Sequence, residues 1–485
     1  MGSLLRALCV NNFKNSRTLR IATALCVATT FCAVGNMALA QSYSRSDEKR
    51  TVPESQAQVQ LSFAPVVKKV APAVVNIYTS RKVQLQNPFM NDPLFRHFFS
   101  GLGLTMGERT ENSLGSGVII GPDGLIVTSN HVIQGAQEVK IVLNDRREFD
   151  AKIILNDKKS DLALVRIEAQ GAAFPYLPLR DADMLEVGDL VLAVGNPFGV
   201  GQTVTSGIVS GLARTTVGVS DFQFFIQTDA AINPGNSGGA LVDMEGNLVG
   251  VNTAIYSTSG ASNGIGFAIP SNMVQTVMAS GVSGNKHVIR PWLGIDVQPV
   301  TREMAEALGL EKPQGVIIND VADYSPARRA GLRPKDVILT IEGNDILDEQ
   351  GMRFRTGTSK IGETVKFGIF RRGRMEEAKV DMVAPPETPP RDVRILRGAH
   401  PFNGLRVANL SPALANELDL NMIEKGVVVI GDSGNRFLKP KDIIIQVESE
   451  EINSTQELER ILARPRQSWQ IAFKRGKQVL GFTIR

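Results

Sequence analysis

A serine between glycines is the residue best suited to chemistry in this 485-residue sequence. The string from Asn233 to Gly239 holds Ser237, with Gly235 two residues before it and Gly238 directly after it. Glycine permits a tight turn that points backbone N–H groups at the space above a hydroxyl, where a developing oxyanion needs donors. Ser237 is therefore a candidate nucleophile, and the N–H groups of Gly235, Asn236 and Ser237 are candidates for an oxyanion hole.

A serine hydroxyl needs a neighbouring base, and the chain holds only four histidines that could supply one. Three are poorly placed: His97 lies in an irregular aromatic stretch, and His287 and His400 lie beside two later repeats. His131 directly follows a predicted strand, where a rigid framework can hold its ring. Asp161 begins another predicted strand and could orient the imidazole.

Each of these features is weak evidence when taken alone. A serine among glycines is more often an ordinary turn, and a histidine after a strand is usually a packing or surface residue. The joint pattern reverses that interpretation, because the order His131, Asp161, Ser237 is the order of the triad in two-barrel proteases of the chymotrypsin type.

Short β-branched segments between turn residues predict that an all-β domain positions these side chains. The predicted strands are residues 117–120, 125–128, 139–143, 162–167, 190–194, 224–227 and 248–251. Before them, a short amphipathic helix from Phe63 to Val70 ends at Pro72, and a first strand runs from Val74 to Tyr78. Residues 87–111 hold four phenylalanines without strand periodicity, which favours a regulatory or assembly loop over an ordinary insertion.

The last 200 or so residues contain an internal repeat, which indicates two copies of one module. The stretch from Gly315 to Ile338 recurs from Gly426 to Ile444. A proline-rich segment lies between the copies, and its extended backbone predicts a semi-rigid spacer. The second copy is shorter, which favours a role in subunit contacts over peptide binding.

Composition narrows the function classes. The net charge is only +4, with both signs interleaved, which gives no support to a nucleic-acid or membrane face. A hydrophobic fraction of 43% is enough to bury real cores. No residues cluster with metal-ligand spacing, so we expect no metal and no organic cofactor.

The N-terminus has the features of an export signal. Arg17 and Arg20 precede an apolar run, and small residues at Ala38 to Ala40 predict cleavage before Gln41. The alternative is an uncleaved membrane anchor, because the apolar run is just long enough to span a bilayer. All three cysteines lie in this leader, so the mature protein can form no disulfide.

Four motifs resemble the HtrA, or Do-like, family of periplasmic serine endoproteases. They are Thr128 to Val132, Ser160 to Leu164, Gly195 to Gly199 and Gln227 to Gly239. The resemblance covers essentially the whole mature chain. It implies a mainly β fold, in which a chymotrypsin-like double β-barrel is followed by two PDZ domains. The expected domains are a signal peptide (1–40), a flexible spacer (41–60), a trypsin-like serine protease domain (61–283), a first PDZ domain (289–384), a Pro-rich linker (385–400) and a second PDZ domain (401–485).

The resemblance also implies a mechanism. Ser237 attacks the scissile carbonyl, His131 carries the proton, and Asp161 holds the imidazole. Asn236 stands where digestive enzymes carry an aspartate that pairs with a newly cut N-terminus, so activation by such a cut is not expected. Family members switch instead by ordering loops around the site. The matching segments here are Arg214 to Asp221, Thr253 to Gly264 and the aromatic stretch at 87–111.

Further expectations concern ligands and assembly. Ile232 and Ile265 suggest a small apolar pocket for the residue before the cut. Trp292, Leu293, Gly294 and Ile295 match the loop with which a PDZ domain captures a C-terminal carboxylate. Unfolded or misfolded proteins and peptides are the expected partners, nucleic acid is not, and the family habit is a homotrimer that can build larger assemblies.

Two classes of function remain open in the sequence. The first is a quality-control endopeptidase in the periplasm that degrades unfolded envelope proteins and also binds them in a chaperone-like way. The second is a chaperone or peptide-sensing scaffold whose proteolysis is incidental. The presence of both Ser237 and His131 favours the first. A membrane-anchored sensor protease is a further variant, but such family members tend to carry a single PDZ domain.

Overall fold

The computed structural model describes residues 62–84, 108–169, 171–196, 201–214, 224–233, 235–255, 262–418, 420–431, 435–476 and 478–484. The expected signal peptide and spacer, and most of the aromatic stretch at 87–111, lie outside these residues. Within the described ranges, no helix is long and apolar enough to cross a membrane.

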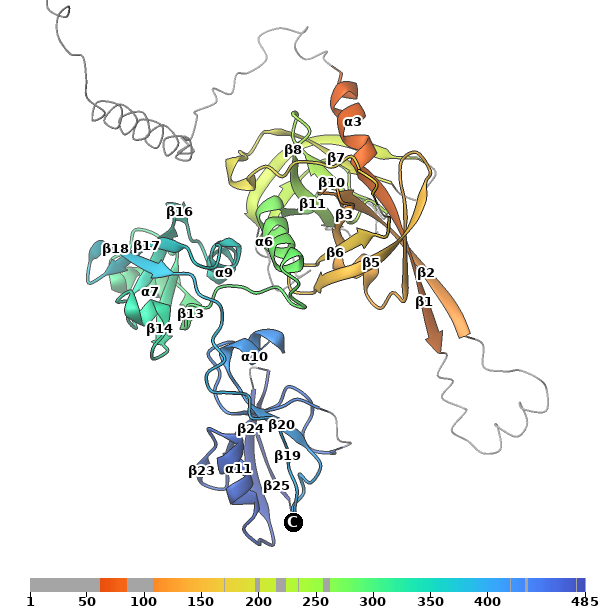
Figure 1. Ribbon diagram of the computed structural model, residues 1–485. Coiled ribbons are helices and arrows are strands. Elements are labelled where there is room, and N and C mark those ends of the chain that lie inside the picture. Colours follow the sequence, from red (N-terminus) through yellow and green to blue (C-terminus); the bar gives the residue numbers. More distant parts are fainter. Residues whose placement is uncertain are drawn as a thin grey trace, which may run out of the picture. The chain divides into compact units, whose positions relative to one another are not determined.

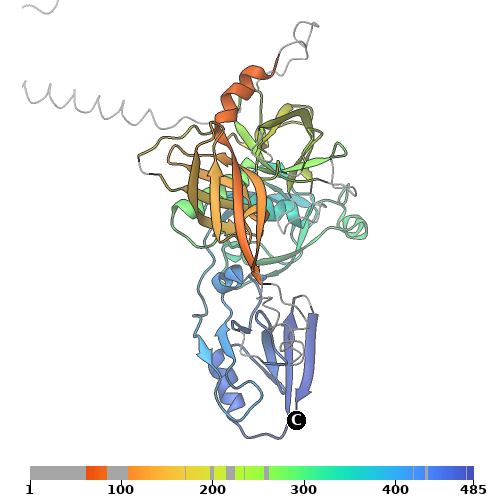
Figure 2. The same ribbon diagram turned by 90° about the vertical axis from the view of Figure 1, so that its right-hand side faces the viewer.

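The first six strands close into a barrel with the order β1-β2-β3-β6-β5-β4 (Figure 1). Its strands are β1 (Val74–Gln84), β2 (Glu108–Ile119), β3 (Leu125–Ser129), β4 (Glu138–Val142), β5 (Glu148–Asp157) and β6 (Leu162–Ile167). β1 and β2 pair out to Gln84 opposite Glu108, and they project from the barrel as a two-stranded ribbon. All five side chains of β3 are buried, which makes this strand a rigid support for whatever follows it. Figure 2 shows the orange and yellow strands of this barrel along their length.

A second six-stranded barrel has the order β10-β11-β12-β9-β8-β7. Its strands are β7 (Leu190–Gly195), β8 (Thr203–Arg214), β9 (Phe225–Thr228), β10 (Ala240–Val242), β11 (Leu248–Ile255) and β12 (Gly266–Pro270). The helical elements of the two-barrel region are α3 (Ala64–Val70), η1 (Ala71–Ala73), α5 (Asn130–Ile133), η3 (Ala182–Met184) and α6 (Ser271–Val282). The predicted amphipathic helix corresponds to α3, whereas the sequence did not predict β5, β8, β10, β12 or α6.

Two further sheets follow the barrels. The first has the order β13-β14-β15-β17-β18, with β16 paired to β15. Its elements are β13 (Ile295–Pro299), α7 (Arg302–Leu308), β14 (Val316–Val321), α8 (Pro326–Arg329), β15 (Val337–Ile341), β16 (Asn344–Asp345), α9 (Glu349–Thr358), β17 (Thr364–Arg371) and β18 (Arg374–Asp381).

The second sheet has the order β19-β20-β21-β22-β24-β25, with β23 paired to β22. Its elements are β19 (Arg394–Ile395), β20 (Arg406–Asn409), α10 (Pro412–Glu417), β21 (Val427–Val429), β22 (Ile443–Val447), β23 (Glu450–Glu451), α11 (Thr455–Leu462), β24 (Trp469–Arg475) and β25 (Gln478–Ile484). The segment expected to be a spacer, 385–400, therefore contributes the strand β19.

An equivalent ion pair in each sheet supports the internal repeat. In the first copy the Arg371 guanidinium donates to both oxygens of Asp336, at 2.7 and 2.6 Å. In the second copy Arg475 donates to both oxygens of Asp442, at 2.8 and 2.7 Å. Both aspartates are buried, and two-point pairing satisfies a buried carboxylate well. The prediction of a mainly β fold with a double barrel followed by two PDZ-type modules is confirmed.

Candidate active site

The pairing of β3 with β6 brings His131 and Asp161 together. Ser129, the last residue of β3, lies opposite Leu162, the first residue of β6. The residues just after β3 and just before β6 must therefore be neighbours. The Nδ1 atom of His131 lies 2.8 Å from Oδ2 of Asp161. Because the carboxylate can only accept, Nδ1 carries the proton of the neutral ring and Nε2 keeps its lone pair.

Asp161 is fixed in one orientation by its surroundings. Its φ of 55° is in the left-handed region, which is uncommon outside glycine and concentrates at functional sites. Its Oδ1 accepts from the backbone N–H of His131 at 3.0 Å, so both oxygens are engaged with the same residue. The Asp161 side chain is 9% exposed, whereas that of His131 is 45% exposed. The pair thus has a buried anchor and an accessible ring.

Ser237 lies in the loop between β9 and β10, where the two barrels meet. Its neighbour Gly238 has a φ of 82°, and a Cβ there would lie 2.2 Å from the carbonyl oxygen of Ser116 and 2.4 Å from Oγ1 of Thr128. A side chain at this position would push the loop away from the first barrel. The predicted need for glycine beside the serine is therefore a need for close approach as well as for a turn.

Ser116, in β2 of the first barrel, ties that barrel to the serine loop of the second. Its N–H donates to the Ser237 carbonyl at 2.9 Å, and its hydroxyl donates to the Gly235 carbonyl at 2.6 Å. The same hydroxyl accepts from the N–H of Asn196 at 2.8 Å. Ser116 is fully buried, so these bonds are shielded from water. They hold Ser237 in position relative to His131, which the first barrel carries.

Thr253, in β11, contacts both the aspartate and the serine. Its hydroxyl donates to Oδ2 of Asp161 at 2.6 Å, and its carbonyl accepts from the hydroxyl of Ser237 at 3.2 Å. A hydroxyl can donate only one hydrogen bond, and in this arrangement Ser237 donates its hydrogen bond to the Thr253 carbonyl. Among the described residues, no hydrogen bond joins Ser237 to the His131 ring. Transfer to His131 therefore requires Oγ of Ser237 to rotate.

The backbone N–H groups that are candidate oxyanion donors differ in whether they already donate a hydrogen bond within the turn. The Asn236 N–H donates to the Asn233 carbonyl at 3.0 Å, which uses that amide within the turn. Gly235 has a φ of 96°, a conformation that glycine adopts readily. The side chain of Asn236 is buried, and its two polar atoms have no hydrogen-bond partner in the described part of the chain.

The two isoleucines expected to form a pocket lie in different surroundings. Ile232 is 1% exposed and packs in the core of the second barrel. Ile265 is only partly buried and packs against a different cluster of buried residues, which includes the core of the first barrel. Ile232 is therefore not accessible to a substrate side chain in this arrangement. The backbone of Arg214 ends β8 and pairs with Phe225, whereas its side chain and residues 215–223 lie outside the described part.

The predicted carboxylate loop precedes β13 in the first module. Gly294 has a φ of 71°, and a Cβ there would lie 2.4 Å from Cβ of Ser325, so this turn requires glycine. Trp292 and Leu293 are buried, whereas Ile295 is half-buried. A pocket of about 460 Å³ is lined by residues 292–297 and by Met352, Arg353, Thr356 and Gly357 of α9, and also by Lys159, Asn416 and residues 420–423. The loop thus opens onto a groove between a strand and a helix.

Sequence reasoning found the three candidate triad residues, and the structure brings two of them into hydrogen-bond contact. It missed Ser116 and Thr253, because both act through contacts between strands that are distant in the chain. The predicted strand 117–120 began one residue after Ser116, so Ser116 itself was not singled out. No sequence pattern singled out Thr253 beyond the loop that begins there.

Comparisons with known proteins agree with this geometry. Residues 115–251 match the family described as "Trypsin-like peptidase domain", and residues 291–382 match "PDZ domain". A "Probable periplasmic serine endoprotease DegP-like" from Chlamydia muridarum is 35% identical over 443 residues, which cover 86% of this chain and 87% of the relative. "Periplasmic serine endoprotease DegP" from Salmonella typhimurium is 36% identical over 434 residues, covering 84% of this chain and 88% of the relative.

A solved structure named "HtrA-type protease AlgW with decapeptide" is also similar. It aligns with a TM-score of 0.50 and 39% sequence identity, covering 67% of this chain and 99% of that one. Both the sequence and the structural similarity extend beyond the barrels into the first PDZ domain. The chain therefore belongs to the HtrA family of DegP-like periplasmic serine endoproteases.

Proposed function

We propose that this serine endoprotease degrades unfolded or damaged proteins of the cell envelope and uses Ser237, His131 and Asp161 as its catalytic triad. The observation that carries the proposal is the 2.8 Å contact between Nδ1 of His131 and Oδ2 of Asp161. That contact leaves Nε2 as the acceptor for a serine proton. Ser237 lies on the loop that Ser116 holds against the same barrel.

Catalysis starts when Oγ of Ser237 turns from the Thr253 carbonyl toward His131. His131 accepts the proton as Oγ attacks the scissile carbonyl, and later gives it to the leaving amine. Asp161, buried and held by Thr253, stabilises the imidazolium that forms between these steps. The N–H groups of Gly235 and Ser237 stabilise the oxyanion, and that of Asn236 joins them only if it leaves the Asn233 carbonyl.

Peptide capture is proposed for the first PDZ domain. Trp292, Leu293, Gly294 and Ile295 form its carboxylate loop, and β13 is an edge strand to which a peptide can add. The relative named with a decapeptide supports peptides as ligands of this kind of protein. Unfolded chains expose extended segments and free ends, so they suit such a groove.

The remaining features of the proposal rest on the family. Export by a signal peptide over residues 1–40 places the mature chain in the periplasm, as the relatives' names say of those proteins. The chain assembles as a homotrimer, and several trimers can combine into larger particles. Arg214 acts at the start of a loop that orders when the site is switched on, and the residue before the cut is small and apolar, next to Ile232 and Ile265.

A second role, chaperone-like holding of unfolded protein, is favoured by one observation. The hydroxyl of Ser237 donates to the Thr253 carbonyl, so in this arrangement the serine is not oriented for attack. In that state the first PDZ domain can still hold a peptide, so both activities are compatible with one chain.

The test is to replace Ser237 by alanine and offer a reduced, unfolded test protein. We expect cleavage to be abolished and binding of the unfolded protein to be retained. A Ser237→Ala protein that still cleaves would contradict the assigned nucleophile. A variant that neither binds nor cleaves, although folded, would contradict the holding role.

A further inference from the structure

The two PDZ-type sheets differ at one edge. In the first, β13 starts the strand order and pairs with β14 on one side only among the described strands. In the second, β20 has the place of β13, but β19 lies on its outer side and precedes it in the order (Figure 1). A peptide ligand adds to a PDZ domain at that edge, next to the strand and beneath a helix. Among the described residues, no strand pairs with this edge in the first module, whereas β19 pairs with it in the second.

The segment that fills the edge is residues 391–396, from the stretch between the two modules. It runs antiparallel to β20, with Arg394 opposite Val407 and Ile395 opposite Arg406. The Asn409 N–H donates to the Arg391 carbonyl at 2.7 Å, and the Leu396 N–H donates to the Leu405 carbonyl at 3.0 Å. These bonds extend the pairing over the length of a short peptide ligand.

The end of this segment lies at the turn before β20, where the first module has its carboxylate loop before β13. Gly404, with a φ of 85°, corresponds to Gly294 of the first module, whose φ is 71°. The Gly404 N–H donates to the carbonyl of Leu396 at 2.7 Å. The side chain of Leu396 is fully buried in the core of the second module. Leu396 thus combines a captured carbonyl with a buried apolar side chain, as the last residue of a bound peptide does.

Alternate side chains of the segment face the helix. Asp392 accepts from the hydroxyl of Thr455 at 2.7 Å, and Arg394 pairs with Glu459, both partners lying on α11. The intervening Val393 and Ile395 are 52% and 48% exposed. From Arg394 to Leu396 this alternation is that of an extended strand with one face on a binding surface, whereas Asp392 has a φ of 40°. α11 itself contacts β20, as α9 contacts β13 in the first module.

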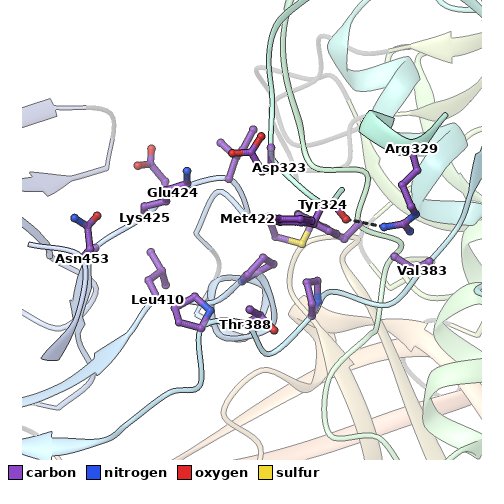
Figure 3. A pocket seen from close by; sticks show the side chains of 17 residues that line it. Asp323, Tyr324, Arg329, Val383, Thr388, Leu410, Met422, Glu424, Lys425 and Asn453 are labelled. Carbon is purple, nitrogen blue, oxygen red and sulfur yellow. Dashed lines mark hydrogen bonds between the residues drawn. The ribbon is translucent and has the colours of Figure 1, made fainter. Parts of the chain in front are cut away.

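The chain before residue 391 is also fixed to the second module. Glu387 accepts from the hydroxyl of Ser411 at 2.7 Å, and Arg391 donates to Glu417 at 2.8 Å. Thr388 and Leu410 both line a cavity of about 520 Å³ (Figure 3). The proline-rich stretch is therefore bound to the second module and positions residues 391–396 at the edge of β20. It is not a free spacer.

We propose that the second PDZ domain holds a built-in ligand: residues 391–396 occupy its peptide groove, between β20 and α11, and exclude external peptides. The site takes an extended peptide that ends in leucine and carries arginine two residues and aspartate four residues before it. Tethering gives the internal ligand a high effective concentration, so an external peptide competes poorly until the segment is loosened. Substrate peptides are then left to the first domain, and in that respect the inference deepens the proposed function and rests on it.

The test uses the mature Ser237→Ala chain and a synthetic decapeptide that copies residues 387–396, with a free C-terminus and a photoreactive group at its N-terminus. Cross-linked positions are mapped by mass spectrometry. We expect only weak, measurable labelling of β20 and α11 in this chain. Arg394→Glu should raise labelling there about fivefold, because it replaces the attraction of the internal segment for Glu459 with repulsion, while the added peptide keeps its arginine.

The matched control restores the internal pair in reverse. Arg394→Glu with Glu459→Arg should again exclude the decapeptide. Equal labelling of β20 and α11 in the starting chain and in Arg394→Glu would overturn the proposal. So would an absence of labelling in Arg394→Glu when hydrogen exchange shows residues 391–396 released.

Hydrogen exchange in the chain without these substitutions decides the matter if Arg394→Glu fails to fold. We expect slow exchange at the amides of Leu396, Gly404 and Asn409, and free exchange at these positions would overturn the proposal. Failure of the proposed function is read separately. It would show as absent labelling of residues 292–297 by a peptide ending in an apolar residue, or as absent cleavage by the chain that keeps Ser237.

Discussion

The hydroxyl of Thr253 lies 2.6 Å from Oδ2 of Asp161 and donates a hydrogen bond to it. The two residues are 92 positions apart in the sequence and belong to different barrels. Thr253 is buried, so water does not compete for this bond. The candidate triad therefore depends on a residue of the second barrel for the orientation of a carboxylate carried by the first.

Replacing Thr253 by valine should slow peptide cleavage. The change removes the donor to Asp161 while keeping the shape of the side chain. A hydrogen bond to a charged group contributes about 1.5–3 kcal/mol, which corresponds to roughly a 10- to 100-fold fall in kcat/KM if it is lost in full. Thr253→Ser keeps the hydroxyl and should stay close to the unmodified enzyme. Equal rates for the valine and serine variants would contradict this role.

Replacing Ser116 by alanine should both destabilise the barrels and reduce activity. The Gly235 carbonyl and the Asn196 N–H would each lose a buried partner, at a cost of about 1–3 kcal/mol in the free energy of unfolding. Denaturant unfolding and peptide hydrolysis measure the two effects. Ser283→Ala is the matched control, because that hydroxyl is exposed at the end of α6. A Ser116→Ala protein no weaker than Ser283→Ala would contradict the role of this contact.

Replacing Gly238 by alanine should abolish cleavage, because the added Cβ meets the Ser116 carbonyl at 2.2 Å. Gly284 provides a control with nearly the same backbone conformation. Its φ is 76°, and a Cβ there meets nothing within 4 Å. Gly284→Ala should therefore cost only the left-handed conformation, about 1–2 kcal/mol, with activity retained. Thermal unfolding and hydrolysis of both variants make the comparison, and similar losses in the two would show that close packing at Gly238 is unimportant.

Lowering the pH should reduce the stability of the second PDZ domain, because His400 becomes protonated. Burial lowers the pKa of His400 below its ordinary value of 6.5, and a backbone hydrogen bond to Arg397 partly offsets this effect. Its Nδ1 also accepts from the Phe402 N–H at 3.2 Å, which an imidazolium cannot do. The unfolded chain then binds the proton more tightly than the folded one, so stability is complete above pH 6.5 and falls as the pH drops below that value.

The measurement is thermal unfolding of the second domain followed by the fluorescence of Trp469, whose ring centroid lies 6.5 Å from that of His400. Trp292→Phe removes the other tryptophan signal. We expect the midpoint to fall between pH 7.5 and pH 5.5, and His400→Gln to reduce that fall. An unchanged midpoint over this range would contradict the linkage.

Local patterns predicted the part of the fold that carries the candidate triad. β3 and β6 are runs of buried β-branched and aliphatic residues, so their positions were read directly from the sequence. β5 consists mostly of exposed and half-buried side chains, and β8 contains Gly207 and Gly211, so neither is a continuous run of buried aliphatic residues like β3 and β6. Tertiary pairing forms these strands in spite of their weak local preference.

The same limit explains what was missed near the site and in the second module. Ser116 and Thr253 are ordinary strand residues until folding brings the barrels together. The prolines of 385–400 predicted an extended spacer, and the backbone there is indeed compatible with a strand. Only the edge of β20 and the burial of Leu396 turn that extended segment into part of a sheet.

The most direct test of the account is to label the mature protein with a fluorophosphonate and to map the adduct by mass spectrometry. The account predicts a single adduct, on Ser237, in the protein that keeps His131. The Ser237→Ala variant should form no adduct. An adduct on a different serine, together with retained cleavage in Ser237→Ala, would contradict the assigned nucleophile.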